Sequence, residues 1–198
     1  MQNAETGPVR LFIALLLPEK VKDEIEKAQM ELRSALPENS VRWARREQFH
    51  LTLKFLGNVE VQRIEPMTHA LRCACENFLP LKLRAERIGF FPDARRPRVV
   101  WAGLHDEQEQ LPLLQRSIEM VVLDFTEEES EEKFSGHVTL GRVKKIQRRE
   151  AEILARLAAG MVERFFGEWT ADTVELIRSE LSSSGARYTI LGAIPLQK

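Results

Sequence analysis

The chain has 198 residues, of which 43% are hydrophobic and 30% are charged, and its formal net charge is −1. This balance is typical of a globular chain and excludes a disordered tail, a collagen and a coiled coil. The longest apolar run, Leu11–Pro18, is about half as long as a membrane-spanning helix, so we expect a buried strand there and no membrane anchor.

Predicted strands and helices alternate along the whole chain. Strands are expected at 10–17, 49–56, 81–88, 98–103, 137–143, 170–179 and 188–195, where apolar residues are continuous or alternate, and a short strand or extended turn is expected at 41–43. Helices are expected at 18–36, 61–78, 107–124 and 147–159, where apolar residues recur every three or four positions. Turns are expected at Gly57-Asn58 and Ser182–Gly185, and loops at 89–97 and 125–135. This order predicts an α+β fold with mostly antiparallel sheets.

Charge is unevenly distributed along the chain. Between Ser40 and Val100 there are twelve basic and six acidic residues, whereas the following stretch ends in the acidic run Glu127–Glu132. A segregated field of this kind can draw an anion toward one face of the protein. The simpler interpretation is that both stretches form ordinary solvated surfaces.

The cysteines and two of the histidines suggest no site. Cys73 and Cys75 lie two positions apart on a predicted helix and cannot supply a disulfide framework. We therefore expect packing roles for them and a reducing, cytoplasmic compartment for the protein. His69 and His105 have no partner motif, and we expect them to be surface or structural residues.

A short motif occurs twice, and its two copies start 87 residues apart. Phe49-His50-Leu51-Thr52-Leu53 resembles Gly136-His137-Val138-Thr139-Leu140. Alternate residues of a strand share a face, so the histidine and threonine of each copy point one way and the apolar residues point into a core. If the two strands lie side by side, two imidazoles and two hydroxyls line one cleft.

These four side chains suit chemistry at a phosphodiester. Two histidines can supply a base and an acid near pH 7, and two hydroxyls can donate hydrogen bonds to phosphate oxygens. A zinc site is disfavoured, because two histidines are too few ligands and threonine is a poor one. A single His-x-Thr is more often a structural pair, but packing gives no reason for the pair to recur.

The two motifs resemble those of the two-histidine phosphoesterases. The wider chain is similar to the RNA 2′,3′-cyclic phosphodiesterases, also called 2′-5′ RNA ligases or LigT-like proteins. The resemblance extends from the opening strand Arg10–Ala14, through His50–Gly57 and Trp101–Gly103, to Tyr188–Leu191. One departure is Gly136, which stands where the family usually has proline and loosens the start of the second motif.

The resemblance implies a single domain over 1–198, bilobal and α+β. Its two pseudo-twofold-related lobes have mostly antiparallel sheets that line a central cleft, with helices outside and one motif per lobe, at 50–53 and 137–140. The implied reaction is hydrolysis of RNA 2′,3′-cyclic phosphate ends to 2′-phosphates without metal or cofactor. Some members also join RNA ends through a reversible 2′-5′ linkage. The implied partner is RNA with a cyclic terminus, and we expect a monomer.

The resemblance also implies roles for the motif residues. His50 is the proton donor to the leaving 3′ oxygen, His137 is the proton acceptor that activates water, and Thr52 and Thr139 bind the phosphate. Three further substrate-binding candidates come from the residues themselves. Arg142 can reach the phosphate only if a bulge or twist turns it onto the face of Thr139, and Trp43 and Phe55 could stack on a base or belong to the core.

Two other functions remain open. The same cleft could serve a phosphodiesterase for a small cyclic nucleotide or nucleoside phosphate. It could also serve a binding module that holds a nucleotide without turnover. Intact histidines and threonines in both motifs favour an enzyme over a binding module.

Overall fold

The computed structural model describes residues 7–129, 134–182 and 185–197. Within these ranges nine strands form one antiparallel sheet in the order β7-β4-β5-β6-β3-β1-β8-β9, and β2 pairs with β6. The strands are β1 (Val9–Leu16), β2 (Val41–Trp43), β3 (His50–Val59), β4 (Leu81–Phe91), β5 (Val99–Asp106), β6 (His137–Val143), β7 (Phe165–Ala171), β8 (Thr173–Ser182) and β9 (Gly185–Pro195). The two strands that carry the repeated motif, β3 and β6, lie next to each other at the middle of this order.

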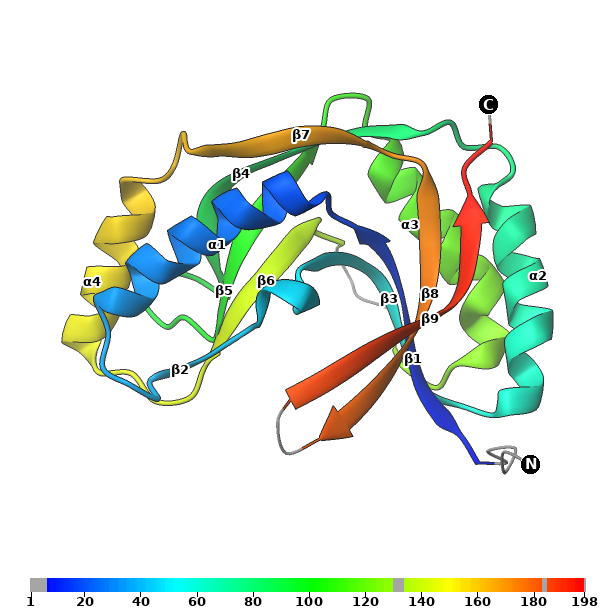
Figure 1. The fold of residues 1–198 in the computed structure, drawn as a ribbon, viewed down its shortest axis with the longest axis horizontal. Helices are drawn as coiled ribbons and strands as arrows, with labels where there is room; N and C mark the ends of the chain where they lie inside the picture. Colours follow the sequence, from blue (N-terminus) through cyan, green and yellow to red (C-terminus); the bar gives the residue numbers. More distant parts are fainter. Residues whose placement is uncertain (1–6, 130–133, 183–184, 198) are drawn as a thin grey trace.

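Helices cover the outer face of the curled sheet at its two ends. They are α1 (Glu19–Ser34), α2 (Ile64–Cys75), α3 (Gln110–Val122) and α4 (Arg148–Ala159), with short 3-10 turns η1 (Arg46–Gln48), η2 (Val61–Arg63) and η3 (Leu123–Phe125). Figure 1 shows α1 and α4 at one end of the molecule and α2 and α3 at the other. The predicted α+β fold, with two halves and helices outside, is confirmed. No helix in the described ranges has the length and apolar content needed to cross a membrane.

Each half of the sheet has its own hydrophobic core. One core packs α2 and α3 against β1, β3 and β8, and the other packs α1 and α4 against β4, β5 and β6. The buried face of each helix follows from the spacing of its apolar residues. In α1 the buried residues are Val21, Ile25, Ala28 and Leu32. The chain crosses between the halves, since α1 follows β1 but packs in the other core.

Two of the predicted boundaries are wrong because strands run through sites that resemble turns. Gly57-Asn58 lies inside β3, which continues to Val59, and Gly57 has a φ of 65° next to a register shift against β1. A glycine can take this left-handed conformation without steric cost, so it forms a bulge and the strand continues. Similarly, residues 89–91 belong to β4, not to the predicted loop.

One strand is absent from the prediction. β7 pairs with β4, and the single strand expected at 170–179 is divided at Asp172 into the end of β7 and most of β8. Gly167, whose φ is 136°, interrupts the apolar pattern of β7, and pairing with β4 compensates for it. Of the predicted acidic loop and the last turn, residues 130–133 and 183–184 lie outside the described residues.

Candidate active site

The two repeated motifs lie side by side at the junction of the two halves. β3 pairs with β6 in an antiparallel register that sets Leu51 opposite Val138. This register brings His50 level with Thr139 and Thr52 level with His137, and directly opposite residues of such strands lie about 4.5–5.5 Å apart. The two His-Thr pairs of the sequence therefore meet on one face of the sheet.

The apolar residues of each motif point the other way. Leu51 and Leu53 are buried in the core of α2 and α3, whereas Val138 and Leu140 are buried in the core of α1 and α4. The histidines and threonines are half-buried on the opposite face. Each motif is thus anchored in its own half and contributes its polar side chains to the space between the halves.

A β-bulge follows the threonine of each motif. β1 pairs Ile13 with Lys54 and Ala14 with Thr52, so that Leu53 is an extra residue on β3. In the same way β5 pairs Val100 with Gly141 and Trp101 with Thr139, so that Leu140 is an extra residue on β6. A bulge shifts the alternation by one residue and re-aims the side chains beyond it.

The two bulges bring Phe55 and Arg142 onto the face of the threonines. Strict alternation would direct Arg142 away from Thr139, yet both residues line the same cavities. Phe55 occupies the equivalent position after Thr52 and lines the same two cavities. The bulge also turns Lys54 inward, and its side chain is 5% exposed.

His50 lies in an aromatic enclosure. Its ring is 4.8 Å from that of Phe12 and 5.4 Å from that of Tyr188. Burial is the main cause of a pKa lowered to about 4, with a smaller contribution from the nearby His137, while a hydrogen bond to the backbone of Gln48 opposes the shift. His50 is therefore neutral at pH 7 in the unliganded protein.

His137 is held in a similar way by different residues. Its Nδ1 lies 2.7 Å from the backbone carbonyl oxygen of Ser135, and its ring makes an edge contact with Phe91 at 4.9 Å. When Nδ1 donates to this carbonyl, Nε2 is left for substrate. The carbonyl of Gly136 accepts a hydrogen bond from the Leu104 N–H at 3.1 Å, which ties the start of the motif to β5 despite the absence of proline.

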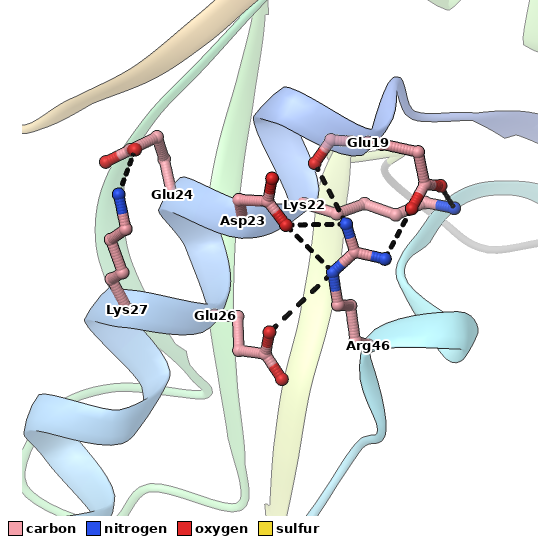
Figure 2. Close-up of polar contacts among 7 residues, drawn as sticks. All are labelled: Glu19, Lys22, Asp23, Glu24, Glu26, Lys27 and Arg46. Carbon is pink, nitrogen blue, oxygen red and sulfur yellow. Dashed lines mark hydrogen bonds and ion pairs between the residues drawn. The ribbon is translucent and has the colours of Figure 1, made fainter.

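A charged cluster fixes the turn that precedes His50. Arg46 of η1 lies over one face of α1, where its guanidinium is paired with Glu19 and Asp23 and lies 3.7 Å from Glu26, as Figure 2 shows. The side chain of Arg46 is 24% exposed, and three carboxylates share its charge, so this network is more than an isolated surface pair. The cluster links the start of β3, and so His50, to α1.

The cleft consists of two cavities that meet at the threonines. The larger cavity, of about 730 Å³, contains His137, and the smaller, of about 240 Å³, contains His50. Thr52 and Thr139 line both. Neither threonine hydroxyl has a hydrogen-bond partner among the residues that the structure describes. The cleft therefore offers two hydroxyl donors between two imidazoles.

The remaining sequence candidates divide between the site and other parts of the fold. Trp43 lines the smaller cavity and also packs on the core of α1 and α4, so its core role is confirmed and its stacking on a base stays a prediction. His69 and His105 are exposed and line neither cavity. Cys75 is buried, and burial raises the pKa of its thiol to about 11.

Sequence reasoning missed the side chains that surround the two histidines. Other strands supply these residues. The ring contacts of His50 are with Phe12 and Tyr188, that of His137 is with Phe91, and Arg10 and Arg42 line the smaller cavity. No local pattern distinguishes these residues from ordinary strand residues. In the part of the chain that the structure describes, no three His, Cys, Asp or Glu residues are grouped to hold a metal ion.

Known proteins are similar to this chain over nearly its whole length, and a family model matches part of it. The family model described as "LigT like Phosphoesterase" matches residues 15–101. An RNA 2′,3′-cyclic phosphodiesterase of Methanothermobacter thermautotrophicus is 33% identical over 183 residues, which cover 91% of this chain and 95% of that protein. A protein of the same name from Aquifex aeolicus is 28% identical over 185 residues, which cover 92% and 95% of the two chains.

Solved structures share the fold. The protein TT0787 of Thermus thermophilus is 30% identical and matches with a TM-score of 0.75, covering 94% of this chain and 97% of that chain. LigT of E. coli, solved in complex with 3′-AMP, matches with a TM-score of 0.75 at 22% identity, covering 96% of this chain and 99% of that chain. The second likeness concerns the fold alone.

Proposed function

The chain belongs to the LigT-like phosphoesterase family, and from this premise we propose that it is an RNA 2′,3′-cyclic phosphodiesterase that converts cyclic ends to 2′-phosphates. The observation that carries the proposal is the pair of His-Thr motifs facing each other across β3 and β6. The relatives named above support phosphoesterase activity on RNA. Joining of RNA ends through a 2′-5′ linkage is the same chemistry with a 5′-hydroxyl in place of water.

The proposed reaction is an in-line displacement at phosphorus. His137 removes a proton from water in the larger cavity, and the water oxygen attacks the cyclic phosphate. The bond from phosphorus to the 3′ oxygen breaks, and His50 donates a proton to that oxygen from the other side. Thr52 and Thr139 donate hydrogen bonds to the non-bridging oxygens, and Arg142 offsets their negative charge. The two histidines thus account for both proton transfers, and the threonines and Arg142 stabilise the negative charge on the phosphate.

The role of acid requires His50 to gain a proton when substrate binds. With a pKa of about 4, its imidazole is neutral in the unliganded cleft at pH 7. A phosphate anion between the threonines favours the imidazolium form and raises this pKa. We expect an unreactive nucleoside 2′-phosphate to raise the pKa of His50 by about 1 to 3 pH units, measured by NMR titration of the ring. His50→Gln identifies the signal, and a pKa that stays near 4 in the complex would exclude His50 as the acid.

Product analysis in the presence of a chelator tests the proposed reaction itself. A 5′-labelled RNA with a 2′,3′-cyclic end is incubated with the protein and EDTA, and the isomer formed is identified. We expect a 2′-phosphate at the rate seen without chelator, because imidazoles, hydroxyls and a guanidinium suffice for the chemistry. Loss of hydrolysis that added zinc or manganese restores would contradict the metal-free mechanism. A 3′-phosphate product would contradict the assignment of the leaving oxygen.

We also propose that the enzyme works in the cytoplasm as a monomer. Cys73 and Cys75 are both free thiols on α2, which suits a reducing compartment. Each half of the cleft is supplied by one motif of the same chain, so a second copy is not needed to complete it.

A further inference from the structure

The two cavities that meet at Thr52 and Thr139 carry opposite charge. The side chains of Arg10, Arg42 and Arg142 line the smaller cavity, and no carboxylate lines it among the residues that the structure describes. Four glutamates line the larger one, namely Glu119, Glu127, Glu128 and Glu129, and they outnumber its two cations, Lys54 and the shared Arg142. The reacting phosphate therefore lies at a boundary between a basic and an acidic side of the cleft.

The arginines of the smaller cavity are arranged for an anion. Arg42 of β2 pairs directly with Arg142 of β6, and like charges directly opposite each other destabilise an antiparallel pair. Within the described residues neither these two arginines nor Arg10 forms an ion pair. Tyr188 lines the same cavity, where its ring lies 5.4 Å from that of His50 and offers a face for a base. Phosphates and bases of an RNA strand suit this combination.

The glutamates of the larger cavity are held in place by a buried lysine. Lys54 pairs with Glu119 at 2.9 Å and also donates hydrogen bonds to the backbone carbonyls of Glu128 and Glu129, at 3.5 and 3.0 Å. The charge of Glu119 is thereby balanced, but Glu127, Glu128 and Glu129 remain exposed at the rim. The bulge in β3 that turns Lys54 inward thus anchors an acidic segment beside the cleft.

We propose that the donor RNA, which carries the cyclic phosphate, lies only along the arginine side, and that the glutamate side admits water but disfavours a second RNA strand. This inference rests on the proposed function. The leaving 3′ oxygen belongs to the donor, so the donor ribose lies beside His50, in the cavity with the arginines. The attacking oxygen enters beside His137, in the cavity with the glutamates.

The charge on the acceptor side of the cleft decides whether water or a 5′-hydroxyl attacks the cyclic phosphate. Attack by water and attack by a 5′-hydroxyl are balanced in the same way: one oxygen–phosphorus bond forms, the bond to the 3′ oxygen breaks, His137 takes a proton and His50 gives one. Water yields a 2′-phosphate, and a 5′-hydroxyl yields a 2′-5′ linkage. The larger cavity has about 730 Å³ of space, so size does not exclude a nucleotide there. The preference for water over the 5′-hydroxyl of an acceptor RNA comes from repulsion between the glutamates and the phosphates of that RNA strand.

The acceptor side is tested with Glu127→Gln/Glu129→Gln, which keeps Lys54 and its partner Glu119. Cyclic-ended RNA is offered glycerol, an uncharged alcohol, or a 5′-hydroxyl oligoribonucleotide, and the joined products are measured against hydrolysis. We expect the variant to raise the fraction joined to the oligoribonucleotide about threefold to tenfold at low salt, with hydrolysis and the glycerol product unchanged. Glu163→Gln, at a position that lines neither cavity, is the matched control.

The donor side is tested with Arg10→Gln/Arg42→Gln. We expect KM for an oligoribonucleotide with a cyclic end to rise about tenfold, and KM for a nucleoside 2′,3′-cyclic phosphate to stay within about twofold. Arg149→Gln, on the outer helix α4, is the matched control.

Each failure has a distinct signature. An unchanged joined fraction in the glutamate variant, including no joining in either protein, would overturn the acceptor side of the inference. An equal rise in KM for both donors, or no rise, would overturn the donor side. Absence of turnover with every cyclic substrate would instead overturn the proposed function.

Discussion

Replacing either His50 or His137 by alanine is expected to lower kcat on cyclic-ended RNA about 100-fold to 10,000-fold. Each ring faces the cleft, while Leu51 and Val138 of the same motifs are fully buried in the two cores. The proton transfers should therefore be lost while the packing is kept. Single-turnover rates measure the loss, and circular dichroism with thermal unfolding measures the fold.

The control for this experiment is His105→Ala. His105 is exposed on β5 and lines neither cavity, so its loss should leave kcat within about twofold of the wild type. His50→Gln complements His50→Ala, because it fills part of the space against Phe12 and Tyr188. If either alanine variant of the motif histidines keeps turnover within about tenfold of the wild type, that histidine has no part in proton transfer.

Thr52→Val and Thr139→Val are each expected to lower kcat about 100-fold to 1,000-fold with little change in KM. Both hydroxyls lie where the two cavities meet, and charge on the non-bridging oxygens redistributes as the nucleophile attacks. Valine keeps the β-branched shape of threonine and removes only the hydroxyl. The measurement is kcat and KM for each single variant and for the double variant.

The double variant separates two ways in which the hydroxyls can act. If they act independently, the two losses of transition-state free energy add, and if they hold the phosphate as one unit, the combined loss is smaller. Near-normal kcat and KM in both single variants would mean that the threonines are only strand residues. The expected result also distinguishes Thr52 and Thr139 from Arg10 and Arg42, whose replacement should raise KM for long RNA.

Local pattern was enough to predict which motif residues share a face. His50 and Thr52 alternate with Leu51 and Leu53, and a strand imposes that alternation whatever it pairs with. For the same reason the bounds of β2 and β6 agree with the predicted ranges, since apolar and polar residues alternate in VRW and in the HVTL that opens β6. The helices of the two cores also follow from a spacing that is visible in sequence.

The residues that surround the motifs depend on contacts between segments that are far apart in the chain. A β-bulge exists only relative to a partner strand, so the extra residues Leu53 and Leu140, and with them the direction of Phe55 and Arg142, depend on pairing with β1 and β5. β7 forms because it pairs with the edge of β4, although Gly167 interrupts the apolar pattern of β7. The enclosure that lowers the pKa of His50 comes from strands far away in the chain.

The separation of charge in the cleft has the same origin. The sequence contains a basic stretch and an acidic run, but a count of charges does not say which side chains face each other. Pairing of β2 with β6 sets Arg42 beside Arg142, and the buried Lys54 holds the glutamate segment at the other side. Alternation and helical spacing are properties of neighbouring residues, so the two motifs and their faces can be predicted from the sequence. Register, bulges and long-range ion pairs are properties of segments that meet only on folding, so the structure decided how those motifs are enclosed and charged.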